Sequence, residues 1–128
     1  MFSENNLKEL IAKAFDLAWE KFQKKNYSHA SMILSQSLKI DPENNKLIQL
    51  FALTQYALGQ YDSAIKNFEK AIIQNPEDSE NLNNLGLCYS GLGKFEKAIE
   101  YLEKSLAINP SISVYKNLGL QFKHLKKY

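Results

Sequence analysis

Apolar residues recur at three- and four-residue intervals along most of the chain, which is the spacing of one face of an α-helix. The pattern is clearest in residues 79–112, where it predicts a helix that ends near Gly93 and a second helix that stops before Pro110. Asp78 or Ser79 is placed to cap the first of these helices. The segment therefore predicts two short amphipathic helices joined by a tight turn.

The same pattern occurs in three consecutive copies of equal length. A fixed period of this kind predicts one supersecondary unit that is copied and stacked. We expect a single domain over residues 1–128, with repeats at 11–44, 45–78 and 79–112 and a partial fourth repeat or capping helix at 113–128. Residues that occupy the same place in each of the three copies include Pro42, Pro76 and Pro110; Tyr27, Tyr61 and Phe95; and Leu38, Ile72 and Leu106.

Small residues recur at two further positions of each copy, midway along the first helix and early in the second. A small side chain at both places predicts that the two helices of a unit approach closely. These residues are Ala18, Ala52 and Gly86 in the first helices, and Ala30, Ala64 and Ala98 in the second helices.

The composition favours helices throughout. Val114 and Thr54 are the only valine and threonine, whereas Ala, Leu, Lys, Glu and Gln are abundant, so the fold class is predicted to be all-α. The formal net charge is +2, and all 16 cationic residues other than histidine are lysines. Because arginine usually makes the bidentate contacts that read guanine or phosphate, we expect no sequence-specific binding of nucleic acid.

The chain shows no pattern typical of a catalytic or metal site. Cys88 is the only cysteine, which excludes an intrachain disulfide and a cysteine metal cage. His29 and His124 have no carboxylate or cysteine at ligand spacing. We therefore predict a protein that is not an enzyme, with no cofactor and with no catalytic, cofactor-binding or metal residues. The first residues lack a secretory signal, and no apolar stretch is long enough to cross a bilayer, so we expect a cytoplasmic protein without a membrane partner.

Taken together, these positions resemble the tetratricopeptide repeat (TPR) over residues 11–128. That motif places a large residue, Leu, a small residue, an aromatic, a turn Gly, an aromatic, Ala and Pro at characteristic intervals. The resemblance implies a right-handed α-solenoid of stacked helix–turn–helix units, whose first helices line a concave face. The third copy supplies Leu82, Leu85, Gly86, Tyr89, Gly93, Phe95, Ala98, Leu102, Ser105 and Pro110, and the second supplies Ile48, Phe51, Ala52, Gly59, Tyr61, Ala64, Phe68, Ala71 and Pro76.

Two departures from the motif matter. In the first copy, Lys25 stands where the turn Gly belongs, so we expect Lys25 to adopt a positive φ. The fourth copy follows the third at an interval that is one position shorter, and it stops at Tyr128, before a second helix. Its helix is interpreted either as a cap or as part of an array that continues, and the missing second helix favours the continuing array.

The resemblance also implies a groove on the concave face, aromatic and apolar near its N-terminal end and polar near its C-terminal end. Exposed aromatic residues are costly in water and commonly anchor interfaces, so this stripe predicts the binding of an extended peptide or a partner helix. In the alternative interpretation, the stripe packs internally or under the segment around Phe2, Leu7 and Leu10. The candidate peptide-binding residues are Phe15, Trp19, Phe22, Gln49, Leu53, Tyr56, Asn83, Leu87 and Lys116.

Some TPR modules bind the C-terminal carboxylate of chaperone tails through Lys, Asn and Arg side chains. Of the corresponding positions here, only Asn84 offers a donor, and Glu80 would repel an anion. We therefore expect no clamp of this kind. The corresponding positions are Phe15, Trp19, Leu50, Glu80 and Asn84.

Three functions follow from these features. The first is a non-catalytic scaffold that binds a protein or peptide partner in the groove. The second is a TPR segment of a larger enzyme, such as a glycosyltransferase. The third is self-association, for example as a homodimer, through the groove or through the apolar N-terminal end of the array. That end comprises Leu7, Ile11, Ala14 and Leu17.

Overall fold

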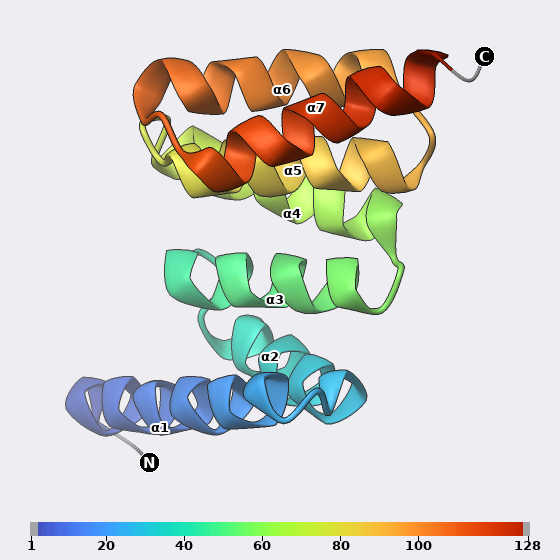
Figure 1. Ribbon diagram of the computed structural model, residues 1–128. Helices are drawn as coiled ribbons and strands as arrows, with labels where there is room; N and C mark the ends of the chain where they lie inside the picture. The colour runs from blue at the N-terminus through green and yellow to red at the C-terminus, as the bar shows by residue number, and fades with distance from the viewer. Residues whose placement is uncertain (1–2, 127–128) are drawn as a thin grey trace.

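The computed structural model describes residues 3–126, and within that range the chain forms helices and no strands (Figure 1). The prediction of an all-α fold is therefore confirmed. The second helices of the three pairs begin at equal intervals along the chain, and the last helix begins one position before a full repeat would place it. The helices are α1 (Glu4–Gln23), α2 (Tyr27–Ile40), α3 (Asn45–Ala57), α4 (Tyr61–Gln74), α5 (Ser79–Gly91), α6 (Phe95–Ile108) and α7 (Ile112–Lys126).

The helices are stacked in chain order, so the molecule is an all-α helical repeat solenoid (Figure 1). Each helix packs against the next one in sequence. In addition, α1 approaches α3, α3 approaches α5 and α5 approaches α7 within 8 Å between Cα atoms, whereas α2, α4 and α6 make no such approach to one another over the described residues. The odd-numbered helices therefore lie closer together than the even-numbered ones, and they form the inner, concave side of the stack.

Small residues allow close packing inside each pair, as predicted. Ala18, Ala30 and Ala52 are fully buried, and so are Ala64 and Ala98. At Gly86 on α5, a Cβ atom would lie 3.0 Å from Leu102 Cγ and 3.1 Å from the Ala98 carbonyl oxygen on α6. A side chain at this position would therefore require atoms of α6 to shift by a few tenths of an ångström.

The turns inside the three pairs have one geometry, and Lys25 adopts it without being glycine. Its φ is +62°, close to the values of +78° at Gly59 and +77° at Gly93. The Lys25 N–H donates to the Phe22 carbonyl at 2.9 Å, and the Asn26 N–H donates to the Lys21 carbonyl at 2.9 Å. These two bonds define a Schellman motif. The prediction of a positive φ at Lys25 is confirmed.

Candidate functional site

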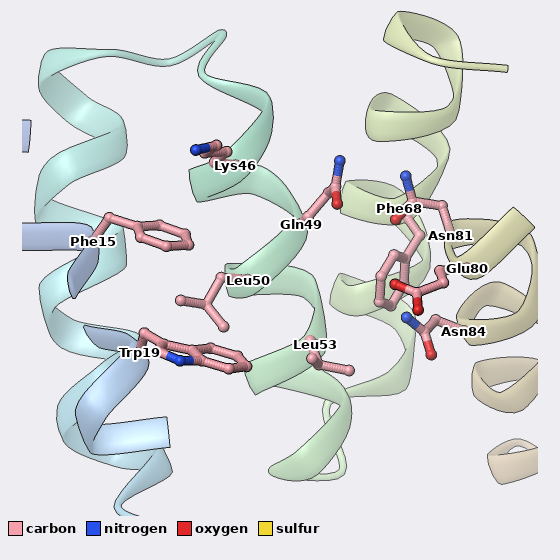
Figure 2. Close-up of a pocket in the computed structure, with 10 residues that line it drawn as sticks. All are labelled: Phe15, Trp19, Lys46, Gln49, Leu50, Leu53, Phe68, Glu80, Asn81 and Asn84. Atoms are coloured by element: carbon pink, nitrogen blue, oxygen red, sulfur yellow. The ribbon is translucent and has the colours of Figure 1, made fainter. Parts of the chain in front are cut away.

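A pocket of about 210 Å³ opens on the concave side, between the inner helices α1, α3 and α5 (Figure 2). Helices α1 and α3 supply an aromatic and aliphatic wall, α5 supplies a carboxylate and two amides, and one residue comes from α4. The lining residues are Phe15, Trp19, Lys46, Gln49, Leu50, Leu53, Phe68, Glu80, Asn81 and Asn84.

The aromatic part of the apolar wall is built on the face of α1 that turns toward α3 (Figure 2). Phe15 and Trp19 lie four residues apart, which places them on one side of the helix. Ala18, the neighbour of Trp19, is fully buried, yet Trp19 itself is 42% exposed. Its ring stacks on Phe22, with centroids 5.7 Å apart. One side of the Trp19 ring is therefore held by Phe22, while much of the ring remains open to solvent.

The polar wall is built on the first turn of α5. The Asp78 side chain caps this helix by accepting hydrogen bonds from the backbone N–H groups of Glu80 and Asn81, at 3.0 and 3.2 Å. Figure 2 shows the side chains of Glu80, Asn81 and Asn84 extending from α5 toward α3. The cap fixes the backbone of this turn, so the start of α5 has a defined position relative to the apolar wall.

Asn81 carries an unsatisfied donor at the pocket. The residue is only 2% exposed, and its Nδ2 has no hydrogen-bond partner within the part of the chain that the structure describes. A buried amide donor without an acceptor costs about 1–3 kcal/mol. An acceptor oxygen supplied by a ligand would remove that cost.

The pocket holds one cation and one anion on different helices. The Lys46 ammonium lies 6.0 Å from the centre of the Phe15 ring, and Glu80 contributes a carboxylate from α5. All five positions that correspond to the carboxylate clamp line this pocket, but they supply two aromatic rings, a leucine, a glutamate and an asparagine. The absence of a clamp remains a prediction. The arrangement offers an apolar surface, hydrogen-bonding groups and no excess of either charge.

Comparison with known protein families decides what kind of array this is. The model of the tetratricopeptide repeat matches residues 80–112, and a second model, described as TPR repeat, matches residues 53–93. These matches fall on the stacked helix pairs α3–α4 and α5–α6. The chain is a tetratricopeptide repeat protein. No curated protein sequence matches it significantly.

Solved TPR structures superpose on most of this TPR protein. The first TPR of Spaghetti (RPAP3), bound to the HSP90 peptide SRMEEVD, has a TM-score of 0.83 at 19% identity, covering 91% of this chain and 93% of that one. The Sgt2 TPR domain from Aspergillus fumigatus has a TM-score of 0.82 at 24% identity, covering 91% and 80%. The O-GlcNAc transferase of Thermobaculum terrenum has a TM-score of 0.84 at 20% identity, covering 94% of this chain but 23% of that one. At these identities the similarity establishes the fold alone.

Four of the nine candidate groove residues of the TPR protein line the pocket together. They are Phe15, Trp19, Gln49 and Leu53. The sequence analysis placed Phe68 in the repeat motif but not in the groove, and it did not name Asn81, although the amide-rich run at residues 81–84 could have drawn attention to Asn81.

The other five candidates lie outside the pocket. Phe22 packs edge-on to Tyr27 with ring centroids 5.2 Å apart, and Tyr56 packs on Tyr61 at 5.7 Å. The alternative of internal packing therefore describes Phe22 better than it describes Trp19. The proposed cover at Phe2 lies outside the described residues. The remaining three are Asn83, which accepts a hydrogen bond from Asn117 at 3.2 Å, Leu87 and Lys116.

Reactive and metal-binding groups do not gather at one place in the described part of the chain. It contains no cluster of three or more His, Cys, Asp or Glu side chains that could hold a metal ion. Burial raises the pKa of the Cys88 thiol to about 12, so this group stays protonated at neutral pH. None of the helices from residue 3 to residue 126 is long and apolar enough to cross a membrane.

Proposed function

We propose that the protein is a cytoplasmic, non-catalytic interaction scaffold that binds an extended segment of a partner protein in the pocket between α1, α3 and α5. The observation that carries this proposal is the open aromatic surface of Trp19 in the same pocket as the unsatisfied Asn81 donor. An apolar concave site with a few fixed polar groups is the usual form of a ligand-binding site. The fold supports the proposal, because a TPR domain of the same shape has been solved with a bound peptide.

The chemistry of the pocket favours a neutral segment with an apolar side chain. An aliphatic or aromatic side chain would lie against Phe15, Trp19 and Leu53, and its burial would contribute about 1.5–3 kcal/mol. The Asn81 Nδ2 would donate to a backbone carbonyl of the segment. A free C-terminal carboxylate would instead lie in a site that contains Glu80, with Lys46 as the single cation of the lining. We therefore propose binding of an internal segment and not of an acidic tail.

Selection from two peptide libraries tests this proposal. One library contains randomised octapeptides that are acetylated and amidated, and the other contains the same sequences with a free C-terminus. We expect the full chain to select capped peptides with a central Leu, Ile, Phe or Met, and to bind the tail peptide SRMEEVD weakly or not at all.

Variants locate the binding site. Trp19→Ala should weaken binding of the selected peptide about tenfold or more, since loss of an aromatic anchor commonly costs about 2 kcal/mol or more. Leu120→Ala removes an apolar side chain of similar exposure (47%) from α7 and should leave affinity within about twofold. Circular dichroism confirms that both variants remain helical. Equal affinity of the wild type and Trp19→Ala would exclude the pocket as the binding site.

A further inference from the structure

Helix α7 exposes an apolar stripe on the side that faces away from the rest of the array. Ile112, Tyr115 and Phe122 are 77%, 55% and 48% exposed, and together with Gly119 they follow one another at intervals of three and four residues, which places them on one side of the helix. Val114 and Gln121 on the other side are buried. A contiguous apolar surface of this kind is typical of an interaction site.

The stripe repeats the surface by which α5 receives α6. Tyr115, Gly119 and Phe122 occupy the places that Leu82, Gly86 and Tyr89 hold in the preceding copy. The α6 helix lies so close to Gly86 that a Cβ atom there would meet Leu102 and the Ala98 carbonyl at 3.0 and 3.1 Å. A Cβ atom at Gly119 would meet nothing within 4 Å. Helix α7 therefore has a site shaped for close approach of a helix, with no helix seated on it in the described part of the chain.

The positive charge beside the stripe indicates which kind of helix could bind there. Residues 111–126 contain no Asp or Glu, and Lys116, Lys123 and Lys126 are exposed. Two of these lysines directly follow the two aromatic residues of the stripe, Tyr115 and Phe122. Complementary charge at the border of an apolar contact steers association and excludes partners of the same charge. Pairing of two α7 helices would bring lysines against lysines, which disfavours a second copy as the occupant.

We propose that the exposed face of α7 (Ile112, Tyr115, Gly119 and Phe122) binds an amphipathic helix of a partner protein that carries acidic residues along one border. The helix docks as α6 docks on α5, with a small residue opposite Gly119. This is the helix-in-groove mode of recognition, in which apolar residues at intervals of three and four anchor the helix. The inference concerns α7 alone and does not depend on peptide binding between α1 and α5.

A peptide based on α6 serves as the probe. Its sequence is that of residues 95–108 with the changes Lys97→Glu and Lys104→Glu, acetylated, amidated and labelled for fluorescence anisotropy. A second peptide, in which every acidic residue is replaced by lysine, has the same apolar residues and the opposite charge. We expect saturable binding of the acidic peptide to the full chain, weakened several-fold in about 0.5 M salt, and no binding of the cationic peptide.

Gly119→Leu is the decisive variant, because the added side chain occupies open space in the protein and the place of the docked helix in the complex. It should weaken binding of the acidic peptide about tenfold or more, because overpacking a close contact is destabilising. Ser113→Leu adds the same side chain to α7 outside the stripe and should leave affinity within about twofold. The proposal is overturned if the acidic peptide does not bind, if both peptides bind equally, or if Gly119→Leu binds as tightly as the wild type. Sedimentation showing a wild-type dimer that Gly119→Leu dissociates would assign the face to a second copy and would also overturn it.

Discussion

Lys25 holds a backbone conformation that its side chain disfavours, so replacing it with glycine should stabilise the protein. Its φ of +62° lies in the left-handed region, where glycine occupies the equivalent positions 59 and 93. The Lys25 side chain is exposed, and no ion pair of residues 3–126 uses its ammonium group. Lys25→Gly therefore changes the backbone preference and removes no recorded side-chain interaction.

Two opposing terms set the size of the effect. A non-glycine residue in the left-handed conformation costs about 1–2 kcal/mol, which the substitution removes. Glycine also gives the unfolded chain more freedom, which costs about 0.4–1 kcal/mol. The two hydrogen bonds of the turn use backbone groups and are kept. The net gain in the free energy of unfolding is then about 0.5–1 kcal/mol, or about 2–4 °C in melting temperature for a chain of this size.

Urea denaturation and thermal melting, both followed by the circular dichroism of the helices, measure this change. Gly59→Lys is the matched reciprocal variant, because a Cβ atom at Gly59 would meet nothing within 4 Å and only the backbone preference opposes the change. The free energy of unfolding of Gly59→Lys should fall by about as much as that of Lys25→Gly rises. If Lys25→Gly brings no gain while Gly59→Lys brings the expected loss, the left-handed turn at Lys25 is not strained, and the reasoning from φ is refuted.

Three further predictions concern buried and closely packed positions. Because burial raises the pKa of Cys88 to about 12, the thiol ionises at lower pH in the unfolded chain than in the folded protein. Its contribution to stability is therefore complete below about pH 9 and is lost as the pH rises toward 12. The urea midpoint should fall less between about pH 8 and 10 in Cys88→Ala than in the wild type. Gly119→Ala should raise the free energy of unfolding by about 1 kcal/mol, because alanine has the higher helix propensity. In Gly86→Ala the new methyl group would meet Leu102, which should cancel most or all of this gain. Equal melting temperatures of the two variants would contradict the close approach of α5 and α6. The buried Gln121 Oε1 has no partner over residues 3–126, whereas its Nε2 donates to the Asn117 carbonyl at 3.2 Å. Gln121→Met removes the cost of the unpaired oxygen and loses this one bond, so it should stabilise the protein by up to about 1 kcal/mol in urea denaturation, and a lower midpoint would count against it.

The sequence allowed the fold to be predicted in detail because each position could be compared in several copies. The turn at Lys25 is an example, since its role is evident only from Gly59 and Gly93 at the same place in the other copies. The close approach at Gly86 was predicted in the same way. The spacing of apolar and small residues follows from the regular geometry of the helices, so it can be recognised in the sequence itself.

The candidate site was only partly predictable, because the direction of a side chain depends on its neighbours in space. Phe22 was assigned to the groove with Trp19, but it lies beside the turn and packs against Tyr27 of the next helix. Tyr56 does the same with Tyr61. Asn81 was missed because its importance arises from burial and from an unpaired Nδ2, and neither is visible in the one-dimensional pattern.

Trp19 provides a direct measurement of groove binding, because it is the only tryptophan in the chain and lies at the pocket with 42% of its surface exposed. The capped apolar peptide obtained by selection is titrated into the wild-type protein while tryptophan emission and its quenching by acrylamide are recorded. Binding in the pocket predicts a shift of the emission to shorter wavelength and protection from acrylamide, both saturating with the affinity measured by anisotropy. A peptide that binds while the emission and quenching of Trp19 stay unchanged would show that the concave pocket is not where this protein meets its partner.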